Sequence, residues 1–422
     1  STALAGQVLE ALWELVRAGR CEISSTPHGE WGLKASADRA QLAKEIASDT
    51  AGYVRDFDRV FDPSGFAIPA ERIAGLDPVF LWTLHAAREA LRSAGISVTR
   101  HDTAPRGTVV LGNLSYPTRS LVEMALEVWE GRPATVDPRN RFMSGLPAQI
   151  VAEAIGFGGG AFALDAACAS SLYAVKLACD RLHDGVADVA LAGGVNHADD
   201  LFLHLGFTAL AALSPSGRSR PFHRGADGLV PAHGAALVVL KRLADAEQNG
   251  DRILGVIRGV GLSNDGRSRG LLVPSEAGQI RAMRAAYAMS GLSPDAVSLL
   301  ECHATGTPLG DAAEIRSLRE VFATATDLPL GSLKSNLVHL VTASGTAALI
   351  KVMAAMNAGV RPKTIAADEP LEELRSGSIR ILREEEPWPS TGPRLAGINN
   401  FGFGGNNAHL LVEEYVPGHR AP

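Results

Sequence analysis

The chain has 422 residues, of which 46% are hydrophobic and only 5% aromatic, and its formal net charge is −6. The basic residues are dispersed without the stripe that nucleic-acid binding requires. No signal peptide is visible, and no apolar run approaches the ~18 residues that a membrane span needs. We therefore expect neither nucleic acid nor membrane as a partner. A single core stops growing at roughly 250–300 residues, so this length predicts two core-bearing halves.

The first half alternates helical and strand-like segments. Hydrophobic spacing predicts a helix at residues 7–19, with Leu12, Leu15 and Val16 on one face. The further segments are helices at 79–94 and within 136–155, strands at 108–112, 161–164, 186–195 and 235–240, and a loop at 213–228.

A second α/β series follows. It comprises helices at 277–290, 312–321 and 343–358, and strands at 253–260, 297–302, 379–382, 395–398 and 408–412. Such alternation is typical of layered α/β architecture with substantial parallel sheet.

The cysteines and histidines show no metal-binding pattern. Neither the four cysteines nor the histidines of residues 195–235 have metal-ligand spacing, and the cysteines form no disulfide framework; they are Cys21, Cys168, Cys179 and Cys302, and His197, His204, His223 and His233. We therefore expect no metal site, and a reducing, cytoplasmic location.

Cys168 is the strongest candidate for a catalytic residue. It lies in the sequence LDAACASSL, between a short apolar strand and a stretch with helical periodicity. This predicts a thiol at or near a helix N-terminus, where free backbone N–H groups and the helix dipole favour the thiolate. The alternative is a buried core cysteine, the commoner fate of a lone cysteine among apolar residues.

Two histidines far downstream favour the catalytic interpretation. His303 lies in ECHATGTPLGD and His339 in KSNLVH, and each follows a strand-like apolar segment and precedes a loop of Gly/Thr or Ser/Thr residues. Active-site residues tend to lie at such strand ends. A cysteine with sequence-distant histidines is a pattern of thiol catalysis, although each histidine alone could be a satisfied core residue.

Four motifs together resemble β-ketoacyl synthases, the condensing enzymes of fatty acid and polyketide synthesis. DAACASS resembles the family's nucleophile motif, ECHATGTPLGD its first histidine motif, KSNLVH its second, and FGFGGNNAH at 401–409 its C-terminal glycine loop. They occur in the family's order. LGNLSYPT at 111–118 and the paired asparagines of the glycine loop are most similar to large type I synthases of polyketides or polyunsaturated fatty acids.

The resemblance implies the thiolase fold, an α/β architecture layered α-β-α-β-α from two pseudo-symmetric halves. We expect residues 1–245 to form the N-terminal half with the nucleophilic cysteine, and residues 246–422 the C-terminal half with both histidines and the glycine loop. The boundary falls in the polar stretch 241–252.

The same resemblance implies catalytic roles. Cys168 takes over the acyl chain, and the backbone N–H groups of Cys168 and Phe403 form the oxyanion hole. His303 and His339 stabilise the negative charge that develops when a malonyl thioester loses carbon dioxide. Lys334 supports the site electrostatically, and the alternative for it is a solvated surface lysine.

Substrate binding is also implied by the resemblance. Thr305 and Thr307 would hydrogen-bond a phosphopantetheine arm, with turn-forming hydroxyls as an almost equal alternative. Gly402, Phe403 and Gly404 would lie beside the acyl chain, the glycines allowing close backbone approach and the phenyl ring acting as a gate. The alternative for Phe403 is a core phenylalanine in a tight turn.

The implied partners follow from the same family. The domain itself would bind no cofactor, because its substrates are carried on the phosphopantetheine of an acyl carrier protein. We expect neighbouring synthase domains and a two-fold homodimer in which the strand before Cys168 pairs across the interface.

The sequence departs from the family pattern in several places. His233 stands in place of a usual glutamate, Val338 in place of a usual glycine, and Ala304 in place of a common glycine. Family members also usually open with an apolar strand and a glycine-rich turn, and Ser1 begins after that point.

Rival functions are a thiol hydrolase, a thiolase-type enzyme, a condensation-inactive partner subunit, and a silent domain that only transfers or gates acyl chains. Thiolases typically use a second cysteine as base, and the motifs do not place Cys302 for that role. Inactive partners lack the nucleophile, and silent domains usually lose a histidine, whereas Cys168 and both histidines are present here.

Overall fold

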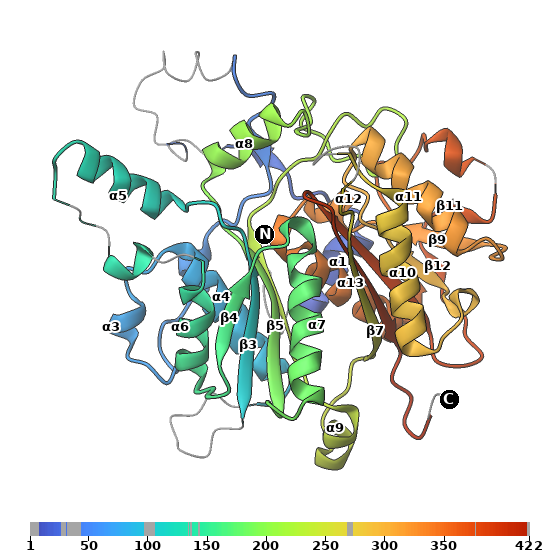
Figure 1. Ribbon diagram of the computed structural model, residues 1–422, viewed down its shortest axis with the longest axis horizontal. Helices are drawn as coiled ribbons and strands as arrows, with labels where there is room; N and C mark the ends of the chain where they lie inside the picture. Colours follow the sequence, from blue (N-terminus) through green and yellow to red (C-terminus); the bar gives the residue numbers. More distant parts are fainter. Residues whose placement is uncertain are drawn as a thin grey trace.

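Two β-sheets lie side by side and organise the molecule (Figure 1). The computed structural model describes residues 8–26, 31, 44–96, 106–133, 135, 137–141, 144–267, 273–375 and 377–419. Residues 1–7, with the expected first residue of the opening helix and the departure noted at Ser1, lie outside the described residues.

The N-terminal half is built on a four-stranded sheet in the order β4-β3-β5-β6. Its strands are β3 (Gly107–Asn113), β4 (Ala161–Leu164), β5 (Val189–Asn196) and β6 (Gly234–Leu240). β3 is parallel to β4 and β5, whereas β6 is antiparallel to β5. Helices α4 (Pro78–Ser93) and α6 (Leu146–Ile155) cover one face, and α7 (Ser170–His183) covers the other. Both central strands are buried at every residue, as a sheet covered on both faces requires.

The C-terminal half is built on a six-stranded sheet in the order β11-β9-β8-β13-β14-β7. Its strands are β7 (Val256–Asn264), β8 (Leu299–Glu301), β9 (Leu328–Gly331), β11 (Ile379–Ile381), β13 (Leu395–Gly402) and β14 (Asn406–Glu413). Helices α10 (Glu276–Ser290) and α11 (Pro308–Val321) cover its outer face. α13 (Ser344–Ala358) covers the inner face and packs against α7, so the layers run α-β-α-β-α (Figure 1).

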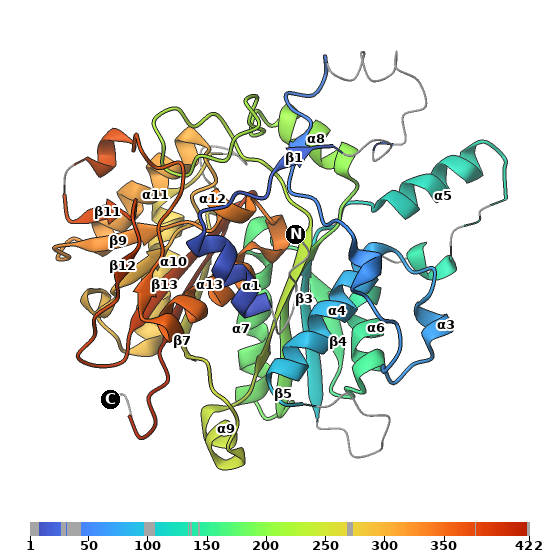
Figure 2. The same ribbon diagram turned by 180° about the vertical axis from the view of Figure 1, so that it is seen from behind.

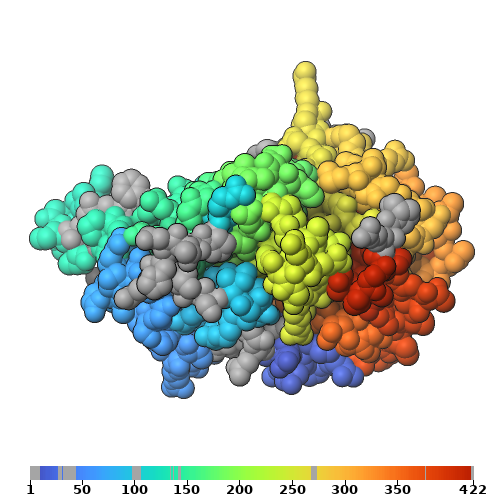
Figure 3. All heavy atoms as spheres, turned by 90° about the horizontal axis from the view of Figure 1, so that it is seen from below, coloured from blue at the N-terminus to red at the C-terminus, as the bar shows by residue number. Residues whose placement is uncertain are grey.

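The predicted strands and long helices are present, with boundaries shifted by a few residues. The opening helix is α1 (Val8–Arg17), whose Leu12, Leu15 and Val16 are buried beside α13. In the view from below, α1 (dark blue) lies at the lower edge of the picture, next to the C-terminal half (Figure 3). The N-terminal half, coloured blue to green, and the C-terminal half, coloured yellow to red, lie side by side. In the described part of the chain, no helix is both long and apolar enough to cross a bilayer.

Several elements were not predicted, and four of them are described first. They are α5 (Arg119–Trp129), α8 (Asp200–Ala209), α9 (Leu243–Asn249) and β9. α5 has no buried residue and projects from the body (Figures 1 and 2), although its partly buried Leu121 packs against the N-terminal core. α9 lies in the polar stretch that was interpreted as a boundary. The remaining short elements are α3 (Ala70–Ile73), α12 (Lys334–Leu337), β1 (Ser24–Ser25) paired with β2 (Thr50–Ala51), and β10 (Val360–Arg361) paired with β12 (Glu386–Pro387).

The edge of β6 that faces away from β5 has no paired strand among the described residues. In the other sheet, β7 pairs antiparallel with β14 at the comparable edge. An apolar cavity of about 420 Å³ lies along β6, between α4 and β7, and its lining includes Ala90, Leu237 and Ile257.

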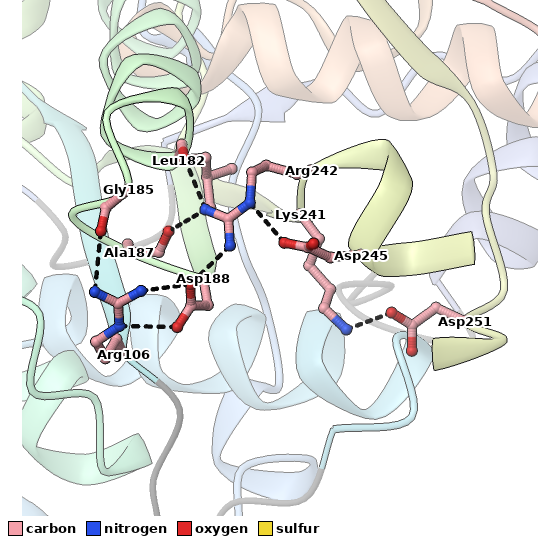
Figure 4. A network of polar contacts seen from close by, with 9 residues as sticks. All are labelled: Arg106, Leu182, Gly185, Ala187, Asp188, Lys241, Arg242, Asp245 and Asp251. Atoms are coloured by element: carbon pink, nitrogen blue, oxygen red, sulfur yellow. Dashed lines mark hydrogen bonds and ion pairs between the residues drawn. The ribbon is translucent and has the colours of Figure 1, made fainter. Parts of the chain in front are cut away.

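A polar network fixes the amino ends of the parallel strands (Figure 4). Arg242 donates to the carbonyl oxygens of Leu182 and Ala187 at 2.7 and 2.8 Å and to Asp188 at 2.7 Å. Arg106 makes two further bonds to Asp188, each 2.9 Å long. The network joins the start of β3, the end of α7 and the start of β5, at the opposite end of the sheet from Cys168.

Candidate active site

The nucleophile turn tightly connects β4 to α7. A 3-10 turn covers Ala167–Ala169 and α7 begins at Ser170, so Cys168 lies immediately before a helix N-terminus, as predicted. Ala167 has a φ of 50°, a left-handed conformation that is strained for a residue with a Cβ. The Ser170 hydroxyl accepts a bond from the Ala166 N–H and donates one to the Ala167 carbonyl oxygen, which holds the turn.

The glycine loop lies directly against this turn. A Cβ at Gly402 would lie 2.7 Å from the Ala166 carbonyl oxygen and 3.1 Å from the Cys168 nitrogen, so the approach requires glycine. The backbone N–H groups of Cys168 and Phe403 both interact with the Cys168 thiol. Two backbone donors therefore converge on the sulfur. The Phe403 ring is half-buried beside Phe207 of α8, with ring centroids 6.2 Å apart.

Both predicted histidines meet Cys168. His303 follows β8, and His339 follows α12 and is 1% exposed. His339 Nε2 lies 3.0 Å from Cys168 Sγ. One ligand-type atom from each of Cys168, His303 and His339 lies within 4.8 Å of the other two. The three residues come from both halves, so the site exists only where the two halves meet.

Buried charges surround the histidines. Lys334 is only 4% exposed, so the alternative of a solvated surface lysine is wrong. Glu301, from β8, forms a fully buried ion pair with Lys351 of α13 at 2.6 Å. The carboxylate of Glu314, on α11, accepts bonds from the backbone N–H groups of His303 and Ala304 at 2.9 and 2.8 Å. These two carboxylates hold in place the loops that carry His303 and His339.

Burial makes the resting site uncharged at the reacting atoms. Burial and then the Lys334 charge hold the pKa values of His303 and His339 well below the usual histidine value, so both imidazoles are neutral. Burial also raises the pKa of Cys168 to about 11, although the Lys334 charge and the N–H groups of Phe403 and Cys168 act in the opposite direction. The N–H groups at the helix start thus act in the predicted direction, but burial outweighs them, so the net pKa of the thiol is raised.

Two residues of the site were missed by the sequence analysis. Ser344 Oγ lies 3.0 Å from His339 Nδ1 and orients that ring. Asn400 donates to the Cys168 carbonyl oxygen at 2.6 Å and also interacts with His303. Asn400 precedes the glycine loop by one residue, and Ser344 opens a small-residue helix, so neither stood out by its spacing.

The remaining predicted residues lie on the same loops. Thr305 and Thr307 hydroxyls are 3.0 Å from each other, an arrangement that allows either a turn or a substrate contact. Gly404 has a φ of 80°, which favours glycine. Val338 and Ala304, two of the departures from the family pattern, have φ values of 51° and 25°, so each stands where glycine would be unstrained.

His233, the third departure, belongs to a buried cluster around Asp200. His233 Nε2 and His204 Nδ1 lie 3.4 and 3.3 Å from Asp200 Oδ1, and His197 lies edge-on to His233 with centroids 5.4 Å apart. Just before His233, residues 230–232 exchange backbone hydrogen bonds of 2.8 Å with His339. The cluster therefore adjoins the backbone segment that is hydrogen-bonded to His339.

Comparison with known proteins identifies the family. Residues 2–246 match "Beta-ketoacyl synthase, N-terminal domain", and residues 254–368 match "Beta-ketoacyl synthase, C-terminal domain". The chain belongs to the β-ketoacyl synthase family. Members of this family are acyltransferases.

Relatives of this ketosynthase are parts of polyketide synthases. It is 37% identical to the spectinabilin polyketide synthase system protein NorA' of Streptomyces orinoci, over 96% of this chain and 11% of that protein. It is 35% identical to the pikromycin polyketide synthase component PikAIII of Streptomyces venezuelae, over 96% of this chain and 26% of that protein. The chain thus spans about a quarter or less of these curated relatives.

Solved ketosynthases share the fold. The structure titled "PfaC Keto synthase-Chain length factor" superimposes with a TM-score of 0.91 at 34% identity, over 99% of this chain and 48% of that one. The ketosynthase from module 6 of the bacillaene synthase of Bacillus subtilis 168 gives a TM-score of 0.84 at 30% identity, over 97% and 70% of the two chains. The architecture is therefore the thiolase fold that the motifs implied.

Proposed function

We propose that this ketosynthase catalyses decarboxylative Claisen condensation between an acyl chain carried on Cys168 and a malonyl-type extender. One observation carries the proposal. The Cys168 thiol faces His339 Nε2 at 3.0 Å, His303 is close by, and both imidazoles are neutral. A neutral imidazole has one nitrogen that can accept a proton and one N–H group that can donate a hydrogen bond. The first half-reaction needs the acceptor, and the second needs the donor.

In the first half-reaction, the sulfur of Cys168 attacks the carbonyl carbon of an acyl thioester. The new C–S bond forms to Cys168, the old one breaks, and the Cys168 proton passes by way of His339 to the leaving carrier thiol. The N–H groups of Cys168 and Phe403 hold the oxyanion. Each such donor typically contributes about 3 kcal/mol to the chemical step.

In the second half-reaction, a malonyl thioester loses carbon dioxide. The electron pair of the broken C–C bond passes to the α-carbon and the thioester oxygen, where N–H groups of His303 and His339 stabilise the charge. The carbanion then attacks the acyl carbonyl, and Cys168 leaves. Lys334 lowers the pKa of both histidines and favours negative charge nearby.

The rival reactions have less support. A thiolase-type enzyme needs a second cysteine as base, but Cys302 Sγ contacts the Leu300 carbonyl oxygen at 3.9 Å, within its own strand segment. A silent domain that only transfers chains has no need for two oriented histidines.

Two half-reactions can be tested separately. Intact-mass spectrometry should show Cys168 acylated by an acyl thioester, and Cys168→Ala should abolish both acylation and condensation. His303→Ala should leave acylation largely intact while suppressing loss of carbon dioxide from malonyl carrier protein. Acylation of Cys179 or Cys302 in the Cys168→Ala variant would overturn the nucleophile assignment, and equal loss of both half-reactions in His303→Ala would make that histidine an activator of the thiol.

The substrates would arrive on the phosphopantetheine arm of an acyl carrier protein, with no cofactor bound by this domain. Thr305 is 6% exposed and pairs with Thr307 at the loop that carries His303, which supports their contact with the arm. The relatives named above support a setting among neighbouring domains of a polyketide or polyunsaturated fatty acid synthase. The free state of all four cysteines supports a reducing, cytoplasmic location. We retain 1–245 and 246–422 as the two halves.

We also propose a two-fold dimer through β4. Among the described residues β4 pairs only with β3, and its four residues are half-buried, which leaves an edge beside Cys168 for a second strand. The projecting α5 would add to this interface (Figure 1). Light scattering of the chain should give about twice 44.3 kDa, and a monomer at micromolar concentration would contradict the homodimer. The structure titled as a keto synthase with a chain length factor supports a second ketosynthase-like domain as the other partner to test.

A further inference from the structure

Three side chains that bind soft metal ions converge at the base of the site. Cys168, His303 and His339 come from segments far apart in sequence, yet their ligand atoms all lie within 4.8 Å of one another. The closest pair, Cys168 Sγ and His339 Nε2, is 3.0 Å apart. One thiolate with two imidazoles is a donor set that suits Zn²⁺, and a three-residue set leaves the fourth position open.

The ligands are already oriented. His339 Nδ1 is bonded to Ser344 Oγ, so its Nε2 is directed at the sulfur, as second-shell bonds fix metal-binding histidines. The backbone of His303 is held by Glu314, and its buried Nδ1 has no hydrogen-bond partner in the described part of the chain. Each imidazole therefore has one ring nitrogen that can be directed toward an ion beside the sulfur.

The distances allow one ion. Bonds of about 2.0–2.3 Å in tetrahedral geometry set ligand atoms roughly 3.3–3.8 Å apart. The longest permitted separation here is 4.8 Å, so side-chain shifts of about 1 Å close the site around the ion.

We propose that Cys168, His303 and His339 bind one Zn²⁺ or another thiophilic divalent cation reversibly, and that the bound ion switches the ketosynthase off. The Cys168 thiol gives its proton to solvent and a sulfur–metal bond forms, with no change of oxidation state. The nucleophile and both oxyanion-stabilising imidazoles are then occupied at once. A chelator that removes the ion returns the thiol and the activity.

The surrounding charges set how tightly the ion is held. The positive charge of Lys334 disfavours a bound cation, whereas the carboxyl group of Glu314 favours a bound cation. The ion pair of Glu301 with Lys351 adds no net charge. The site is therefore a reversible one that binds more weakly than a structural zinc site. Lys334→Met should bind the metal several-fold more tightly while condensing more slowly, an opposite pair of effects that a merely loosened site would not produce.

Co²⁺ and Zn²⁺ test the proposal without any acyl substrate. Titration of the full chain with Co²⁺ should give a thiolate-to-cobalt charge-transfer band that saturates at one ion per chain. The band should vanish in Cys168→Ala, weaken in His303→Ala and persist in the control variant Cys179→Ala. Zn²⁺ should slow alkylation of Cys168 by iodoacetamide by at least tenfold, and a chelator should restore it.

The binding claim fails if the band survives Cys168→Ala, or if saturating Zn²⁺ leaves Cys168 alkylation unchanged. The inhibition claim rests on the condensation proposed above, whereas the spectrum does not. A chain that shows the cobalt band but does not condense would refute the proposed condensation and support the metal site. A chain that condenses but shows no cobalt band would support the condensation and refute the metal site.

Discussion

Replacing Ser344 by alanine should slow catalysis through His339, although Ser344 never touches the substrate. Ser344 Oγ lies 3.0 Å from His339 Nδ1, and the two residues are 5% and 1% exposed. A hydroxyl can accept from an Nδ1–H or donate to a bare Nδ1. It therefore supports both the state of His339 that takes the thiol proton and the state that donates to the thioester oxygen.

The size of the effect follows from burial. Leaving a buried nitrogen without its partner costs about 1–3 kcal/mol, because no water replaces the lost bond. At about 1.4 kcal/mol per factor of ten, condensation should slow about 5- to 150-fold. Both half-reactions should slow, because His339 takes part in each.

Single-turnover acylation and condensation assays, scaled to the folded fraction, measure this loss. Thr346→Val is the matched control, since the Thr346 hydroxyl lies on the same helix and bonds the Ala236 carbonyl oxygen at 2.9 Å without touching a histidine. It should lose stability but keep its rate per folded molecule. If Ser344→Ala turned over as fast as Thr346→Val, the proposed role of Ser344 in orienting His339 would be refuted.

Three further predictions concern stability and the gate. Lys351→Met should lower the free energy of unfolding by about 3–5 kcal/mol, because it leaves the Glu301 carboxylate buried without its partner, and urea denaturation showing a loss under about 1 kcal/mol would contradict this. Burial alone would raise the pKa of Asp200, but bonds and charge from His204 and His233 lower it, and Asp200 in turn raises the pKa of His204 against burial. The lowered pKa of Asp200 contributes folding stability that is present above about pH 3.9 and is lost as the pH falls through the folded pKa of Asp200. The raised pKa of His204 contributes folding stability that is present below about pH 6.5 and is lost as the pH rises through the folded pKa of His204. The destabilisation caused by Asp200→Asn should therefore be greatest between about pH 4 and 6.5, and a larger difference at pH 9 in urea melts would contradict it. Phe403→Ala should broaden the range of acyl chains that acylate Cys168, and crystals of the free and acylated enzyme should show two Phe403 positions; one unchanged position would leave the ring as packing against Phe207.

The candidate catalytic residues could be predicted because each lies in a motif that is contiguous in the chain. His303 follows a strand and Cys168 lies just before a helix start, as predicted, whereas His339 follows the short helix α12 and not a strand. The layered fold could be predicted for a similar reason, since the alternation of apolar strands with helices is written along the sequence.

The remaining features could not be predicted, because they depend on packing between segments that are distant in the sequence. Nothing in the spacing around Lys334 reveals that it is buried, and nothing near Cys168 reveals how strongly desolvation acts on its thiol. Cys168, His303 and His339 have no metal-ligand spacing in the sequence, because only the fold brings them together. α8 was missed although Asp199 caps its start and accepts from the Phe202 N–H.

The raised pKa of the Cys168 thiol has a consequence for the lifetime of the enzyme. Oxidation to sulfenic acid and attack on stray electrophiles both proceed through the thiolate, and both need access. A nucleophile that stays protonated and buried between turnovers escapes most of this damage. It becomes reactive only when a substrate supplies the carbonyl group and the proton acceptor that the chemistry needs. Between turnovers, a synthase that waits for its carrier is therefore exposed to less oxidation and slower alkylation at Cys168.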